Sequence, residues 1–98
     1  MGESAIEKRT VRLAGELGWE SYKWVSPGRR GVPDRIFLSA GGVVVFMEFK
    51  APGAKPTPLQ ERTLRSLRAT GHHATWVDNV QDALDFLDEA VESKKLST

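Results

Sequence analysis

The sequence predicts a single α/β domain, in which a mixed β-sheet is flanked by helices in the order αβββαβα. The chain has 98 residues, which is the length of one domain. Apolar residues recur at helical spacing in three segments. Four shorter segments are rich in β-branched and aromatic residues, and glycine- or proline-rich stretches separate them. This succession fits a sheet with helices packed against it.

The first half of the chain contains one predicted helix and three predicted strands. The helix covers residues 4–17, with Ser4 as N-cap, Glu7 at the capping-box position and Gly18 ending it. The strands cover residues 20–26, 34–39 and 43–50. The stretch "PGRRGVP" separates the first two strands, and "AGG" forms a turn between the second and third.

The second half alternates helix, strand and helix. Thr57 caps a helix that ends at residue 69, and Pro58 occupies its first turn. A short strand follows at residues 73–77. Asn79 caps the last helix, which we expect to end near residue 91 and to leave a frayed tail at about 93–98.

The composition favours a soluble protein with an uneven charge distribution. Net charge is +1, there is no cysteine, and no segment resembles a signal peptide or a membrane span. We therefore expect a cytoplasmic protein with no membrane partner. The segment from residue 29 to 68 is basic and the segment after residue 78 is acidic, which suggests one positive face. A solvated helix surface is the alternative interpretation.

Polar residues interrupt the end of the otherwise apolar third strand. Because side chains alternate along a strand, Glu48 and Lys50 share one face. If the "SAGG" turn pairs the second and third strands, Asp34 lies opposite this end. Two carboxylates and one ammonium then converge, and hard oxygen ligands of this kind suit Mg²⁺ or Mn²⁺. The alternative is an ion pair of Lys50 with Glu48 or Asp34 and no metal.

The stretches "PD" at residues 33–34 and "EFK" at residues 48–50 resemble the PD-(D/E)xK signature of metal-dependent phosphodiesterases. The longer pattern "GVPDRIF…VVFMEFKAPGAKPTPLQ" is similar to the VRR-NUC branch, the virus-type replication and repair nucleases. The resemblance spans roughly residues 6–77. It implies a restriction-endonuclease-like core and a stand-alone protein of a bacterial or phage-infected cell.

The resemblance also implies roles for individual residues. Asp34 and Glu48 would bind the metal together with the main-chain carbonyl of Phe49, and Lys50 would be the catalytic lysine. Glu7 corresponds to an acid on the family's first helix that lies near the metal, directly or through water. Gln60 corresponds to a glutamine that opens the helix after the E-x-K strand. Completing a capping box is the alternative role for both Glu7 and Gln60.

Basic residues near these positions suggest a DNA partner. The predicted DNA-binding residues are Arg29, Arg30, Arg35, Lys55, Arg62 and Arg65. No segment resembles an element that reads base edges, so we expect recognition of backbone and shape. The adjacent His72 and His73 point opposite ways along a strand and do not suggest a metal site. The three tryptophans show no stacking pattern and are expected in the core or at an interface.

The sequence thus predicts a divalent-metal-dependent DNA endonuclease. Stand-alone members of the family that it resembles are similar to Holliday-junction resolvases in size and element order, which favours branched DNA. Paired nicks in a four-way junction require a homodimer, because one chain carries one site. A nuclease acting on flaps or 5′ ends and a non-catalytic DNA-binding module are the alternatives. We also expect Asp34→Ala to abolish cleavage and leave the metal-free fold as stable or slightly more so, because it relieves carboxylate repulsion.

Overall fold

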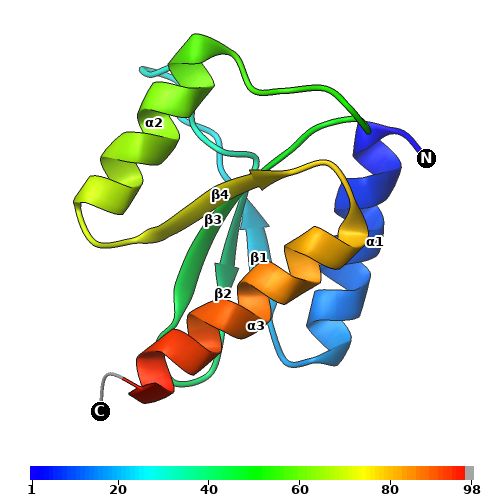
Figure 1. Ribbon diagram of the computed structural model, residues 1–98, viewed down its shortest axis with the longest axis vertical. Coiled ribbons are helices and arrows are strands. Elements are labelled where there is room, and N and C mark those ends of the chain that lie inside the picture. Colours follow the sequence, from blue (N-terminus) through cyan, green and yellow to red (C-terminus); the bar gives the residue numbers. More distant parts are fainter. Residues whose placement is uncertain (97–98) are drawn as a thin grey trace.

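The computed structural model describes residues 1–96, which form one four-stranded sheet and three helices (Figure 1). The elements in chain order are α1 (Glu3–Glu16), β1 (Glu20–Lys23), β2 (Arg35–Leu38), β3 (Val44–Phe49), α2 (Pro58–Ala69), β4 (His73–Val77) and α3 (Val80–Leu96). The strands lie side by side in the order β1-β2-β3-β4. The β1–β2 and β2–β3 pairs are antiparallel and the β3–β4 pair is parallel. The predicted element order and mixed sheet are confirmed.

Helices cover both faces of this sheet. Figure 1 shows α1 and α3 on one side and α2 on the other. Along β3, Val45, Met47 and Phe49 are fully buried and point into the core that the sheet forms with α1 and α3. Phe46 and Glu48 therefore face the side of α2, because neighbouring strand residues alternate. The prediction that the third strand is central and covered on both faces is confirmed.

Two helix ends differ from the prediction. Helix α1 begins at Glu3 after Gly2, and Gly2 provides no side-chain cap. The predicted Ser4 cap and its capping box with Glu7 are therefore wrong, because Ser4 already lies inside the helix. Helix α3 continues to Leu96, with lysines in its last turn that suit the helix dipole. A frayed tail is thus wrong for residues 93–96, while 97–98 lie outside the described residues.

The turn between β2 and β3 sets the register that matters for the site. The Ser39 N–H donates to the Val43 carbonyl at 3.0 Å, and Gly41 and Gly42 have φ angles of 92° and 83°. Such positive φ angles favour glycine, which explains the "AGG" sequence of the turn. With this turn, Arg35 lies opposite Met47. Asp34, one residue earlier, is therefore level with Glu48.

No helix within residues 1–96 is both long and apolar enough to cross a bilayer.

Candidate active site

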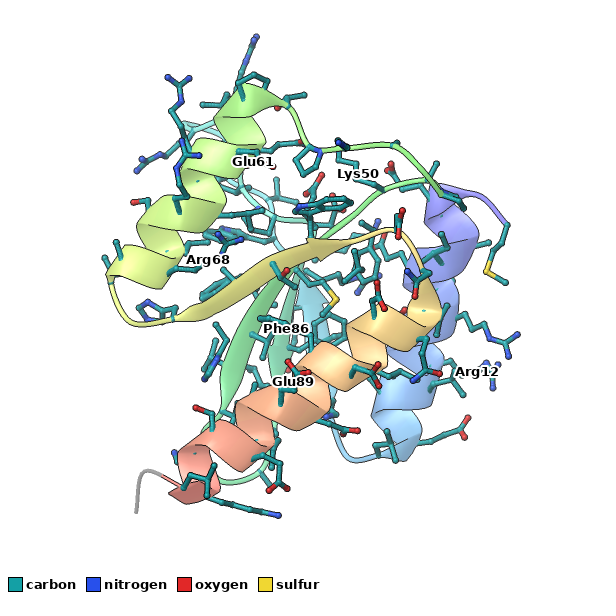
Figure 2. The ribbon with its side chains drawn as sticks, in the orientation of Figure 1. Arg12, Lys50, Glu61, Arg68, Phe86 and Glu89 are labelled. Carbon is teal, nitrogen blue, oxygen red and sulfur yellow. The ribbon has the colours of Figure 1, made fainter. Side chains whose placement is uncertain are left out.

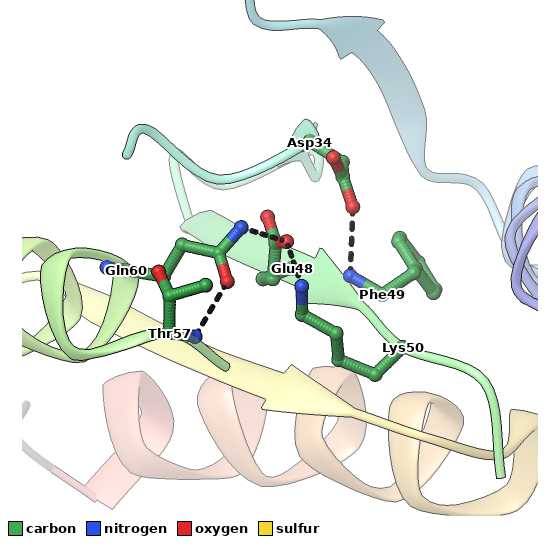
Figure 3. A network of polar contacts seen from close by, with 6 residues as sticks. All are labelled: Asp34, Glu48, Phe49, Lys50, Thr57 and Gln60. Carbon is green, nitrogen blue, oxygen red and sulfur yellow. Dashed lines mark hydrogen bonds and ion pairs between the residues drawn. The ribbon is translucent and has the colours of Figure 1, made fainter. Parts of the chain in front are cut away.

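Asp34 is held in place by the strands on both sides of it. Its carbonyl accepts a hydrogen bond of 3.0 Å from the Trp24 N–H, at the end of β1. Its carboxylate Oδ2 accepts a bond of 2.8 Å from the Phe49 N–H at the end of β3 (Figure 3). The carboxylate therefore lies against the main chain at the end of β3, next to Glu48. The convergence predicted from the hairpin is found.

Glu48 is a buried acid, with only 4% of its surface exposed. Its Oε2 accepts a hydrogen bond of 2.8 Å from the Gln60 side-chain amide and lies 3.3 Å from the Lys50 Nζ (Figure 3). Its Oε1 is buried and has no hydrogen-bond partner within residues 1–96. A buried carboxylate oxygen without a partner costs free energy, so this atom marks a place where a cation would be favourable.

The electrostatics of the two carboxyls agree with this picture. Burial raises the pKa of Asp34, and the charges of Glu7 and Glu3 raise it further, while the hydrogen bond from Phe49 lowers it. Burial and then the charge of Asp34 raise the pKa of Glu48 to about 7, although Lys50 lowers it. Both acids are thus hard to ionise together without a counter-ion.

Gln60 caps helix α2 and also contacts Glu48. Its side-chain oxygen accepts from the Thr57 N–H at 2.9 Å, and its own N–H donates to the Thr57 hydroxyl at 3.2 Å. These two bonds form a complete capping box at the start of α2. Because the same side chain donates to Glu48, the helix cap also fixes the orientation of the buried acid.

Glu7 reaches the neighbourhood of the site but is engaged by other residues. Its Oε2 accepts a hydrogen bond of 2.7 Å from the Arg35 Nε and lies 4.0 Å from the Lys23 Nζ. The Glu7 and Arg35 side chains are only 15% and 16% exposed. The predicted roles of Glu7 at a metal and of Arg35 at DNA therefore compete with this internal ion pair.

We expect Glu7→Ala to destabilise the protein by about 2 kcal/mol, because it leaves the largely buried Arg35 guanidinium without its partner. The free energy of urea unfolding measures this. Glu7→Gln keeps a hydrogen-bond acceptor and is the matched control, with a smaller loss. An unchanged unfolding free energy in Glu7→Ala would show that the ion pair is not structural.

The acids of the site fit a divalent ion by their chemistry, although they are few. No group of three or more His, Cys, Asp or Glu side chains in residues 1–96 is arranged as a metal cluster. The oxygen donors on hand are the Asp34 and Glu48 carboxylates and main-chain carbonyls. This donor set suits a hard ion such as Mg²⁺, which keeps several waters and needs only one or two protein carboxylates.

Only some of the predicted DNA-binding residues lie together in the structure. Arg29, Arg30 and Arg62 line one open pocket between the loop before β2 and helix α2. By contrast, Arg65 is 4.0 Å from Glu61 on its own helix, as an exposed pair. Lys55 is exposed. The structure thus brings three of the predicted arginines together.

A hydrogen bond anchors the loop that carries Lys55, between β3 and α2. The Gly53 N–H donates to the Asp78 carboxylate at 3.0 Å. The pKa of Asp78 is lowered by this bond and by a second bond from the Asn79 side chain. The role of Asp78 in anchoring this loop was not predicted, because its partner lies 25 positions earlier.

Glu3 was not predicted as a residue near the site either, although its charge acts on Asp34 and Glu48. Its place four residues before Glu7 puts both acids on one helix face.

Comparison with known proteins agrees with this geometry. No family model matches the chain. A solved structure named "VRR_NUC domain" superposes with a TM-score of 0.80 at 26% identity, covering 88% of this chain and 94% of the other. A protein of Acyrthosiphon pisum secondary endosymbiont phage 1, named "Putative nuclease p44", is 48% identical over 77 residues, which are 79% of this chain and 83% of that protein. The chain belongs to the VRR-NUC family.

A second VRR-NUC structure, "VRR_NUC domain protein", superposes with a TM-score of 0.74 at 12% identity. It covers 94% of this chain and 89% of the other, and it supports the fold alone. The resemblance seen in the "PD" and "EFK" stretches is therefore confirmed at the level of family and fold. The family is one of nucleases, and this VRR-NUC protein is accordingly a nuclease-type enzyme.

Proposed function

We propose that this VRR-NUC protein hydrolyses phosphodiester bonds in DNA with the help of Mg²⁺ or Mn²⁺. The observation that supports this most directly is the buried Glu48 carboxylate, which has an unpartnered Oε1 and lies level with Asp34. An ion pair with Lys50 alone leaves that oxygen unsatisfied. The name of the phage relative, a nuclease, agrees with the proposal.

Each residue of the site has a distinct task in this proposal. Asp34, Glu48 and the main-chain carbonyl of Phe49 would hold the ion. When bound, the ion would polarise the scissile phosphate and supply an activated water. The Lys50 ammonium lies 3.3 Å from Glu48 Oε2, and it would stabilise negative charge on the phosphate and orient the attacking water. Gln60 would fix the orientation of the Glu48 carboxylate through its hydrogen bond to Oε2.

DNA would be bound mainly through its phosphates. Arg29 and Arg30 belong to the loop that leads directly into Asp34, and Lys55 belongs to the loop that follows Lys50. Positive groups therefore lie in the loops that precede Asp34 and follow Lys50 along the chain. Such contacts position a duplex without reading its sequence.

We further propose that the substrate is branched DNA, with a four-way junction as the first candidate. Resolving a junction takes two symmetric nicks, and one chain has one site, so the working unit would be a two-fold homodimer. A nuclease acting on flaps or 5′ ends needs no such symmetry. A DNA-binding module without catalysis has no use for the carboxylate pair.

A nicking assay on four-way junctions, flaps and plain duplex, with Mg²⁺, Mn²⁺ or EDTA, separates these functions. We expect metal-dependent cleavage of branched DNA and none in EDTA. Binding without cleavage under every condition would identify a non-catalytic module. Sedimentation at the assay concentration tests the dimer, and a monomer that still cuts flaps would leave the nuclease but remove junction resolution.

A further inference from the structure

Two adjoining pockets lie between the loop before β2 and helix α2. The first has a volume of about 490 Å³ and is lined by Arg29, Arg30 and Arg62. The second has a volume of about 290 Å³. Arg29, Thr63 and Ser66 line both pockets, so the two spaces share a wall. Figure 1 shows this loop, in cyan, passing behind the upper end of α2.

The loop is seated tightly on the helix. Gly31 has a φ of +84°, and a Cβ at this position would lie 2.8 Å from the Leu59 Cγ and 3.1 Å from the Thr63 hydroxyl. Only glycine fits such a close approach at positive φ without displacing the helix side chains. The loop and helix α2, which form the pocket walls, are therefore in close contact at Gly31.

The first pocket is suited to phosphate. Arg29, Arg30 and Arg62 are exposed, and none of them forms an ion pair with an acid of residues 1–96. Arginine binds phosphate oxygens with a planar, two-pronged donor group. The three residues line one pocket, two from the loop and one from α2. A DNA phosphate would be favoured at such a pocket.

The second pocket is suited to an aromatic ring. Its wall includes Trp24, Val32 and Leu67, with Ser26 at its side. The Trp24 ring packs against Phe46, with centroids 5.2 Å apart, which holds the indole in place. Its volume of about 290 Å³ is near the lower end of the range of ligand pockets and leaves room for one planar base. A base that is paired and stacked within a duplex is not available to such a pocket, so the base that enters would be unpaired.

We propose that the two pockets together bind one unpaired nucleotide, with its phosphate on the arginines and its base against Trp24. This rests on the proposed action on DNA and specifies its substrate as duplex with an unpaired nucleotide at the branch. Gln60, which holds Glu48, is on the same helix as Ser66 and about 9 Å from it along the axis. The unpaired nucleotide is therefore bound within a few nucleotides of the cut. Stacking of this kind tolerates every base, in agreement with recognition that does not read sequence.

The experiment measures DNA binding in EDTA, so that no cleavage is required. The full chain is titrated into a fluorescein-labelled splayed-arm duplex and anisotropy is followed. Single abasic sites are then placed at each arm position near the fork, which remove a base and keep every phosphate. We expect one position to weaken binding about tenfold. Equal affinity for all abasic substrates and for the intact arm would overturn the proposal.

Matched variants assign the effect to the two pockets. Ser26→Leu fills the second pocket and should remove the abasic effect, whereas Val25→Leu places the same side chain at a neighbouring exposed residue outside both pockets. Arg62→Gln should weaken binding of every DNA and lower the salt dependence by about one counter-ion. Arg12→Gln removes the same charge on the far side of the molecule (Figure 2) and should do neither. An abasic effect that persists in Ser26→Leu would place the base elsewhere and overturn the assignment.

The binding experiment and the nuclease assay test two separate proposals. Base-dependent binding by a protein that never cleaves would retain the nucleotide pocket and reject the proposed hydrolysis. Metal-dependent cleavage without any base dependence would retain the hydrolysis and reject the pocket.

Discussion

Asp34→Asn is expected to lower the cleavage rate by on the order of 10³-fold or more, while the protein keeps nearly its full stability. Asparagine has the same shape as aspartate but lacks the negative charge that would hold a divalent ion. Its side-chain oxygen can still accept the hydrogen bond that the Phe49 N–H gives to Asp34 at 2.8 Å. Single-turnover cleavage in Mg²⁺ and urea unfolding in EDTA measure the two effects separately.

Asp34→Ala is the informative contrast, because the structure changes the expectation for it. The sequence alone suggested that removing the carboxylate relieves repulsion and leaves the fold as stable or more so. The hydrogen bond with Phe49 is now an opposing effect, since alanine leaves the backbone N–H of a fully buried residue without its partner. That loss costs about 1–3 kcal/mol. We expect the alanine variant to be less stable than the asparagine variant, and wild-type cleavage by Asp34→Asn would reject the site.

The fold was predictable because local signals and hydrophobic pattern agree in this chain. The alternation of Val45, Met47 and Phe49 with Phe46 and Glu48 identified a central strand, and the glycine turn before it set the pairing register. The ends of the helices were less predictable. Ser4 has the residue type of an N-cap, yet Glu3 is already helical, and nothing local to Ser4 distinguishes the two starts.

The site was predictable to the extent that it depends on strand register. Asp34 and Glu48 converge because the register of the β2–β3 hairpin places them level with each other. The partner of Glu7 was not predictable, since Arg35 lies 28 positions away and meets it only after α1 has packed on the sheet. The two pockets depend in the same way on the close approach of Gly31 to Leu59, which unites a loop with a helix formed much later in the chain.

Glu48→Gln is expected to abolish cleavage and, in the absence of metal, to stabilise the protein at pH 8 but not at pH 5. The folded pKa of Glu48 is about 7, above its ordinary value of 4.5. A carboxyl with a raised folded pKa binds its proton more tightly in the folded state. Wild-type stability should therefore fall as pH rises from about 4.5 to 7, by at most about 3 kcal/mol. Glutamine does not titrate, so the part of this slope that Glu48 causes should disappear in the variant.

Metal should reverse the wild-type loss, because a bound cation favours the ionised carboxylates and stabilises the folded state that binds it. At pH 8, millimolar Mn²⁺ should raise the melting temperature of wild type and leave Glu48→Gln nearly unchanged. Lys50 remains in both proteins, so the comparison separates a metal site from an ion pair. If wild-type stability is flat from pH 5 to 8 and Mn²⁺ has no effect, then Lys50 alone balances Glu48 and the carboxylate pair binds no metal.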